Sequence, residues 1–298
     1  MLTASYVINS LKLIQPIPKH TLKRANENYL FIGGLCAGTT ENEVFLANSS
    51  SDSNVVRMFN VDAAKLDVVD SYQPPNEERV GDVAYSVMSE TLFVVTWNQE
   101  RIGVAVRSFA RVNYEWRCCC ILQLKEAKGR SLFLRVLPDD SLFCSMQKTD
   151  GVHVCRVQAD RSIEHCSRVT LPCQHMGIDA QLVANEKRLT AALVNGTVAL
   201  FRVDENQVIH LLSQILLPRA QYPLFIGDNL LVGVASNEDF SVQVAESFFT
   251  TGGILKYDRK LIPRIDRLDI YRWCFQDISR TLYLWNFKSK ELLVYKAD

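Results

Sequence analysis

Short apolar runs, each entered from a polar turn, recur along the whole chain. Counted from the polar turn residues that precede them, they lie at residues 43–46, 90–95, 140–144, 187–190, 228–232 and 279–284. Successive runs are spaced by about 41 to 52 residues. Apolar runs of this length, bounded by turn residues and rich in β-branched and aromatic side chains, predict β-strands. The regular spacing predicts that one strand-rich unit is repeated along the sequence.

Further strands are expected in each unit. A polar turn and a second run follow the first, and the Asp150-Gly151 and Asn195-Gly196 pairs favour tight hairpins because both turn positions need positive φ. The second runs are 55–59, 103–107, 152–156, 197–201, 242–245 and 291–295. Outer strands are expected before Pro16, Pro172, Pro218 and Pro263, because proline cannot donate to a ladder and belongs at a sheet edge. Candidate innermost strands are 80–85, 132–136, 179–183 and 267–271, and 19–27 is the one expected short helix.

Four strands in about 45 residues, with almost no helix, predict an all-β fold. We expect a single closed β-propeller domain over residues 1–298, with about six and possibly seven four-stranded blades. The expected blades are 29–75, 80–125, 130–172, 176–218 and 222–263. Residues 265–298 form the rest of the last blade, which the N-terminal strand 6–18 closes. Such closure removes exposed sheet edges that invite aggregation.

This strand order and period resemble the WD40-like β-propeller superfamily over essentially the whole chain. At the position of the usual Trp-Asp pair the sequence has Phe59-Asn60, Cys155-Arg156, Phe201-Arg202 and Tyr295-Lys296, and the Gly-His dipeptide is absent. The hydrogen-bonded His/Asp network usual inside such blades is therefore not expected, and no member family is identified. The resemblance implies a rigid platform for other proteins or peptides.

Charge and composition narrow the function classes. Lys plus Arg equals Asp plus Glu at 33 each, which argues mildly against a protein devoted to gripping nucleic acid. No apolar run reaches the ~20 residues that span a bilayer, and the N-terminus has no secretory pattern, so we expect no membrane partner and a location in the nucleus or cytoplasm. The nine cysteines are expected to be reduced and to serve as small core residues.

Signals for catalysis are thin. The chain lacks a phosphate-binding loop, a Gly-x-Ser-x-Gly elbow and a His-Glu-x-x-His motif, and it has five histidines. We therefore expect no enzyme activity and no cofactor. One cluster has zinc-ligand residue types but lacks paired Cys-x2–4-Cys spacing, so no metal site is expected from it: His153, Cys155, His165, Cys166, Cys173 and His175.

The favoured function is a non-catalytic protein–protein interaction scaffold within a larger complex. Aromatic and basic residues in expected loops are candidate contacts, because Trp and Arg are enriched at interface hot spots. They are Trp97, Arg101, Lys148, Arg219, Tyr222, Phe240, Phe248 and Phe249. A nucleic-acid-associated propeller subunit, using Lys19, Lys23 and Arg24, is one alternative. A propeller hydrolase or lyase, with carboxylates or histidines clustered in a polar central channel, is the other.

Overall fold

The computed structural model describes residues 11–22, 32–49, 54–61, 65–72, 74–75, 78–98, 103–113, 115–124, 132–227, 229–235, 239–248, 254–266, 270–286 and 289–298. Over these residues the chain forms 24 strands and one short 3-10 helix, η1 (Lys19–Leu22), so the all-β prediction is confirmed. The helix expected at 19–27 is seen only as η1; residues 23–27 lie outside the described ranges. No helix in the described ranges has the length and apolar character needed to cross a membrane.

The strands pair into six four-stranded sheets. Each of the first five sheets uses four consecutive antiparallel strands, and the sixth joins the first strand to the last three. In chain order the sheets are β2 (Ile32–Ala37), β3 (Glu43–Ser49), β4 (Asn54–Asn60), β5 (Lys65–Tyr72); β6 (Glu78–Ser86), β7 (Thr91–Asn98), β8 (Val104–Val112), β9 (Glu115–Leu124); β10 (Leu132–Val136), β11 (Ser141–Met146), β12 (Gly151–Val157), β13 (Ile163–Thr170); β14 (His175–Val183), β15 (Glu186–Leu193), β16 (Thr197–Val203), β17 (Ile209–Leu216); β18 (Ala220–Ile226), β19 (Asn229–Ala235), β20 (Asp239–Phe248), β21 (Ile254–Asp266); and β22 (Ile270–Gln276), β23 (Thr281–Asn286), β24 (Glu291–Ala297) with β1 (Leu11–Pro18).

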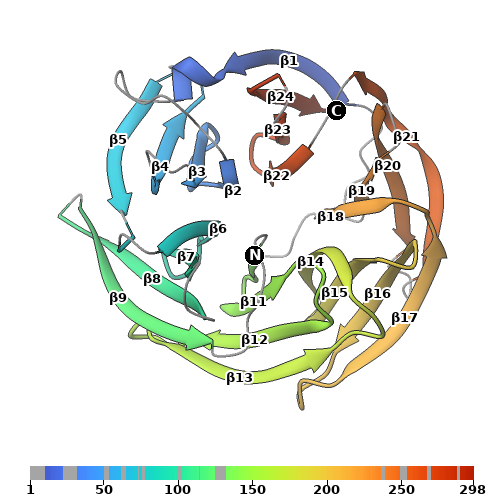
Figure 1. Ribbon diagram of the computed structural model, residues 1–298, viewed down its shortest axis with the longest axis horizontal. Coiled ribbons are helices and arrows are strands. Elements are labelled where there is room, and N and C mark those ends of the chain that lie inside the picture. The colour runs from blue at the N-terminus through green and yellow to red at the C-terminus, as the bar shows by residue number, and fades with distance from the viewer. Residues whose placement is uncertain are drawn as a thin grey trace.

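The sheets stand around a central axis (Figure 1), and their innermost strands are β2, β6, β10, β14, β18 and β22. Strands β2, β6, β10, β14, β18 and β22 each contact the next, and β22 also contacts β2. Strand β1 runs antiparallel to β24, from Leu11 opposite Ala297 to Pro18 opposite Glu291. No seventh sheet occurs in the part of the chain that the structure describes.

The burial pattern follows from this arrangement. In the second strands β7 and β11, consecutive residues are buried on both faces, because each sheet packs between two neighbours. The outer strand β9 is mostly exposed. The core therefore consists of apolar layers between adjacent sheets, with Trp285, Tyr283 and Phe93 among its largest buried side chains.

Two glycines allow the inner strands to approach closely. A Cβ on Gly34 of β2 would lie 2.6 Å from the Cα of Asp82 on β6. A Cβ on Gly177 of β14 would lie 2.9 Å from the backbone nitrogen of Tyr222 on β18. Any larger side chain would push neighbouring sheets apart at these points.

Candidate functional site

Two of the predicted contact residues lie exposed on turns at one end of the sheets. Lys148 follows β11 with a φ of 61°, and Arg219 precedes β18 with a φ of 64°. The backbone nitrogen of Lys148 donates to the carbonyl of His175 at 2.7 Å, which fixes this turn against the next sheet. Their placement suits surface contacts, and their role in binding stays a prediction.

Two other predicted contact residues are not loop residues. Trp97 lies within strand β7, is partly buried and packs against the apolar layer between the second and third sheets. Tyr222 is only 5% exposed and its ring lies 6.0 Å from that of Phe133. The prediction of Tyr222 as an exposed contact is wrong, because its ring fills the space between neighbouring inner strands.

The remaining predicted residues cannot be placed as side chains. Arg101, Phe249, Lys23 and Arg24 lie outside the described residues. Phe240 and Phe248 belong to β20 and Lys19 to η1, but only their backbone is described. The proposed basic nucleic-acid contact therefore remains a prediction.

A buried ion-pair network occupies the inner strands. Arg135 of β10 donates from Nε to Oδ1 of Asp179 on β14 at 2.6 Å, and from Nη1 to Oδ2 of Asp82 on β6 at 3.2 Å. Each carboxylate also accepts a backbone N–H from a neighbouring sheet. The nitrogen of Leu134 donates to Asp82 at 3.0 Å, and that of Phe225 donates to Asp179 at 2.6 Å.

A second arginine extends the network across the centre. Arg272 of β22 donates to the carbonyl of Gly33 on β2, and from Nη2 to the carbonyl of Leu132 on β10 at 2.7 Å. Its guanidinium carbon lies 4.9 Å from the centroid of the Phe133 ring, a cation–π distance. The four side chains of this network come from β6, β10, β14 and β22, and they also bond to the backbone of β2 and β18. The network therefore involves all six innermost strands.

The electrostatics of this network favour a structural role. Burial raises the pKa of Asp82 and that of Asp179, and the nearby arginines oppose that rise. The attraction of these two carboxylates raises the pKa of Arg135 against its own desolvation. Both carboxylates are buried and accept from guanidinium and backbone donors, which is the arrangement of a structural ion-pair network.

A buried serine–histidine pair joins the third and fourth sheets. Oγ of Ser145 lies 2.6 Å from Nε2 of His175 and 2.6 Å from the carbonyl oxygen of Gly151. A hydroxyl has one proton, so the consistent arrangement is His175 Nε2–H donating to Ser145, and Ser145 donating to Gly151. Desolvation lowers the pKa of His175 to about 4, which keeps the ring neutral. A serine whose proton points at a carbonyl is not an activated nucleophile.

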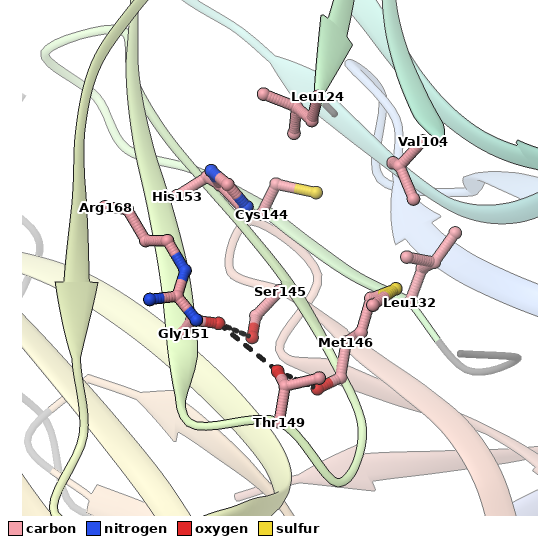
Figure 2. Close-up of a pocket in the computed structure, with 10 residues that line it drawn as sticks. All are labelled: Val104, Leu124, Leu132, Cys144, Ser145, Met146, Thr149, Gly151, His153 and Arg168. Atoms are coloured by element: carbon pink, nitrogen blue, oxygen red, sulfur yellow. Dashed lines mark hydrogen bonds between the residues drawn. The ribbon is translucent and has the colours of Figure 1, made fainter. Parts of the chain in front are cut away.

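Beside this pair lies a small cavity between the second and third sheets (Figure 2). Its volume is about 30 Å³, enough for roughly two water molecules. The lining includes Leu124, Cys144, Ser145, Thr149 and His153. The space is too small for an organic substrate, which needs a few hundred Å³.

The cysteine and histidine residues do not form the zinc cluster that their types suggest. Among the described residues, no three His, Cys, Asp or Glu side chains converge as metal ligands. All nine cysteines are free thiols. Their expected role as core residues is correct for Cys144, Cys155 and Cys274, and wrong for Cys118, Cys119 and Cys166, which are exposed on outer strands.

The turns between the first and second strands of the sheets expose large apolar side chains. Val87 and Met88 in the β6–β7 turn are 55% and 60% exposed, and Ile278 in the β22–β23 turn is 61% exposed. We call the surface formed by the β22–β23, β2–β3, β6–β7 and β10–β11 turns the first-turn face. It lies at the end of the sheets opposite Lys148, because successive strands are antiparallel.

Hydrogen bonds between sheets hold the first-turn face in place. Gln276 Nε2 donates to the carbonyls of Gly38 and Thr40 at 3.0 and 2.9 Å, joining the β22–β23 and β2–β3 turns. Ser86 Oγ donates to Oδ1 of Asp140 at 2.7 Å, joining the β6–β7 and β10–β11 turns. The exposed apolar side chains therefore stand on a rigid base.

Comparison with solved structures identifies the architecture. A chain of the mitotic checkpoint complex aligns with a TM-score of 0.59 at 9% identity, over 98% of this chain and 94% of that one. U3-55K aligns at 0.57 and 11% identity, over 98% of this chain and 100% of that one. Raptor from Chaetomium thermophilum aligns at 0.56 and 10% identity, and the match covers 91% of this chain but only 28% of Raptor. The chain has a WD40-like β-propeller fold. No protein-family model and no curated protein matches the sequence.

The WD40-like propeller contains interactions that its sequence did not reveal. The Ser145–His175 bond is a histidine contact in a chain for which no His/Asp network was expected, and no carboxylate takes part in it. The Asp82–Arg135–Asp179 bridge was also missed. A usable signal for it exists: Asp82 lies within the Val80–Ala84 stretch and Arg135 within the Leu132–Val136 strand, and each is the one charged residue among apolar neighbours and glycine.

Proposed function

We propose that this WD40-like propeller is a non-catalytic interaction platform in a multiprotein assembly, located in the nucleus or cytoplasm, with its sheets forming one closed ring of six blades. The observation that carries the proposal is the first-turn face, where Val87, Met88 and Ile278 are more than half exposed on turns bonded to adjacent sheets. Rigid, exposed apolar side chains favour association, since little conformational entropy is lost on binding.

The surroundings of these side chains indicate the chemistry of the partner. Glu41, Glu90 and Asp277 are exposed on the same turns. Two cations lie at the β22–β23 turn: Arg280 is only partly exposed, and Lys296 donates its ammonium group to the carbonyl of Ser279. A protein segment with apolar side chains flanked by lysine or arginine would match this surface, because opposite charges at the rim steer association and fix its register.

The buried charges of the inner strands support the non-catalytic part of the proposal. The carboxylates of Asp82 on β6 and Asp179 on β14 are paired with Arg135. The cavity between the second and third sheets is too small for an organic substrate. The free state of all nine thiols is consistent with a reducing compartment.

A comparison of two double variants tests the platform. The double variant Met88→Asp with Ile278→Asp alters the first-turn face, and Lys148→Glu with Arg219→Glu alters the opposite face. Both pairs are exposed, so both variants should keep the wild-type melting temperature. We expect the first pair to abolish co-purification of partners from cell extract and the second to leave it intact. Loss of co-purification only in the Lys148→Glu, Arg219→Glu variant would place the docking site on the opposite face. Unchanged co-purification in both variants would refute the platform.

A further inference from the structure

Two histidines meet on the outer half of the third blade. His153 of β12 and His165 of β13 lie on adjacent strands, with Nδ1 of His153 3.1 Å from Nε2 of His165. The ring centroids are 5.3 Å apart and the ring planes meet at 56°. The strand register shifts between Val154 and Cys155, so that Cys155 is opposite His165 and Cys166 is left without a partner. Such a bulge increases the local twist of a strand.

The spacing of the two nitrogens is that of donor atoms sharing one metal ion. An imidazole nitrogen binds Zn²⁺ at about 2.0–2.1 Å, so two such nitrogens in one coordination shell lie roughly 2.9–3.4 Å apart. The observed 3.1 Å falls within this range. In the metal-free pair, one ring donates an N–H to the other. Chelation by both nitrogens moves that proton to the far nitrogen of the same ring.

We propose that His153 and His165 form a two-imidazole site for a divalent transition-metal ion, Zn²⁺, Ni²⁺ or Cu²⁺, whose remaining positions are filled by water. Imidazole suits these ions. His165 is exposed and His153 half-buried, so the ion reaches the pair from solvent. The bound ion would tie β12 to β13.

The neighbouring charges set the strength of binding. Arg168 is the cross-strand partner of His153, and its guanidinium is paired with Asp150 at 3.2 Å. Glu164 accepts from Gln158 at 2.8 Å, so it does not act as a third ligand. Two ligands beside a partly compensated cation give weaker binding than a closed structural zinc site with four protein ligands.

Calorimetry on tag-free protein tests the site. The exposed thiols are first blocked with N-ethylmaleimide, because Cys118, Cys119 and Cys166 would otherwise compete for soft ions. Ni²⁺ and Zn²⁺ are then titrated into the wild type, His153→Asn, His165→Asn and the control His210→Asn. His210 is also an outer-strand histidine, and its ring bonds Asp204 at 2.9 Å.

We expect one ion per chain in the wild type and in His210→Asn, and at least tenfold weaker binding in each of the other two variants. Cu²⁺ bound to the wild type should show coupling to two nitrogens in its electron paramagnetic resonance spectrum. Equal melting temperatures without metal would show that the variants fold. Absence of saturable binding, or equal affinity in His165→Asn, would overturn the proposal.

Discussion

Arg135 of β10 donates to Asp179 of β14 at 2.6 Å, so one buried ion pair joins the innermost strands of the third and fourth blades. Burying charged groups is costly, and the arrangement is favourable only while each charge keeps its partner. The network therefore fixes the placement of the second, third and fourth blades relative to one another.

Replacing Arg135 by methionine tests this role. The change leaves Asp179 buried without a guanidinium and leaves Asp82 with Arg272 alone, whose Nε lies 3.9 Å from Oδ1. We expect the free energy of unfolding to fall by about 3–5 kcal/mol. The matched control is Arg168→Met, which removes an exposed pair with Asp150 and should cost about 0–1 kcal/mol. Urea denaturation measures both, and equal losses would show that the inner network adds no special stability.

The close approach of β2 and β6 gives a second prediction. In Gly34→Ala the new Cβ would lie 2.8 Å from the backbone nitrogen of Val83, which cannot move independently. We expect a loss of about 1–3 kcal/mol, the usual cost of overpacking. Gly103→Ala, where no atom lies within 4 Å, should stay within about 0.5 kcal/mol of the wild type. A neutral Gly34→Ala variant would contradict the tight contact between the first two blades.

The strand pair β1–β24 is tested by two isoleucines of the same strand. Ile17 is 4% exposed and belongs to the apolar layer that includes Trp285 and Leu292, whereas Ile14 is 56% exposed. Ile17→Ala should cost about 2–5 kcal/mol, because it leaves a cavity, and Ile14→Ala should be nearly neutral. Thermal denaturation distinguishes them, and similar melting temperatures would argue against docking of β1 in the last blade.

His175 makes the stability depend on pH. Its folded pKa of about 4 lies below the ordinary value of 6.5, so between these values the unfolded chain binds the proton and the folded chain does not. Above pH 6.5 the His175 ring is neutral in both states and costs no stability. As the pH falls from 6.5 to 4, the free energy of unfolding falls by about 3 kcal/mol because only the unfolded chain takes up the proton.

Urea titrations at several pH values, compared between the wild type and His175→Gln, isolate this effect. The glutamine variant should be less stable near pH 7 and should show a shallower fall between pH 6.5 and 4. An exposed-histidine variant, His210→Asn, serves as the control. Parallel curves for the wild type and His175→Gln would mean that His175 titrates normally.

The strands were predictable because the signals that create them are local. Apolar runs and turn pairs such as Asp150-Gly151 are read within a few residues, and they indicated an all-β propeller. Tyr222 was misjudged because a turn position in the sequence says nothing about a ring that folds back between sheets. The partnership of Arg135 with Asp82 was hidden because the two residues are 53 positions apart.

The candidate docking residues were the hardest to predict. Met88 and Ile278 sit in short turns between strands, where an apolar residue is equally compatible with burial. Only the arrangement of the sheets shows that these side chains point to solvent while Tyr222 does not. The sequence gives the types of residue at a surface, and packing decides which of them remain exposed.

The pairing of β1 with β24 imposes an order on assembly. A ribosome adds roughly 5–20 residues per second, so β1 leaves the exit tunnel on the order of tens of seconds before its partner strand is made. During that interval, the segment carrying Ile17 has an open edge, and the Ile17 side chain that the folded protein buries is in water. The β1 segment of a newly made chain is thus exposed to mispairing and to chaperone capture until β24 has been made, and pairing with β24 ends that period.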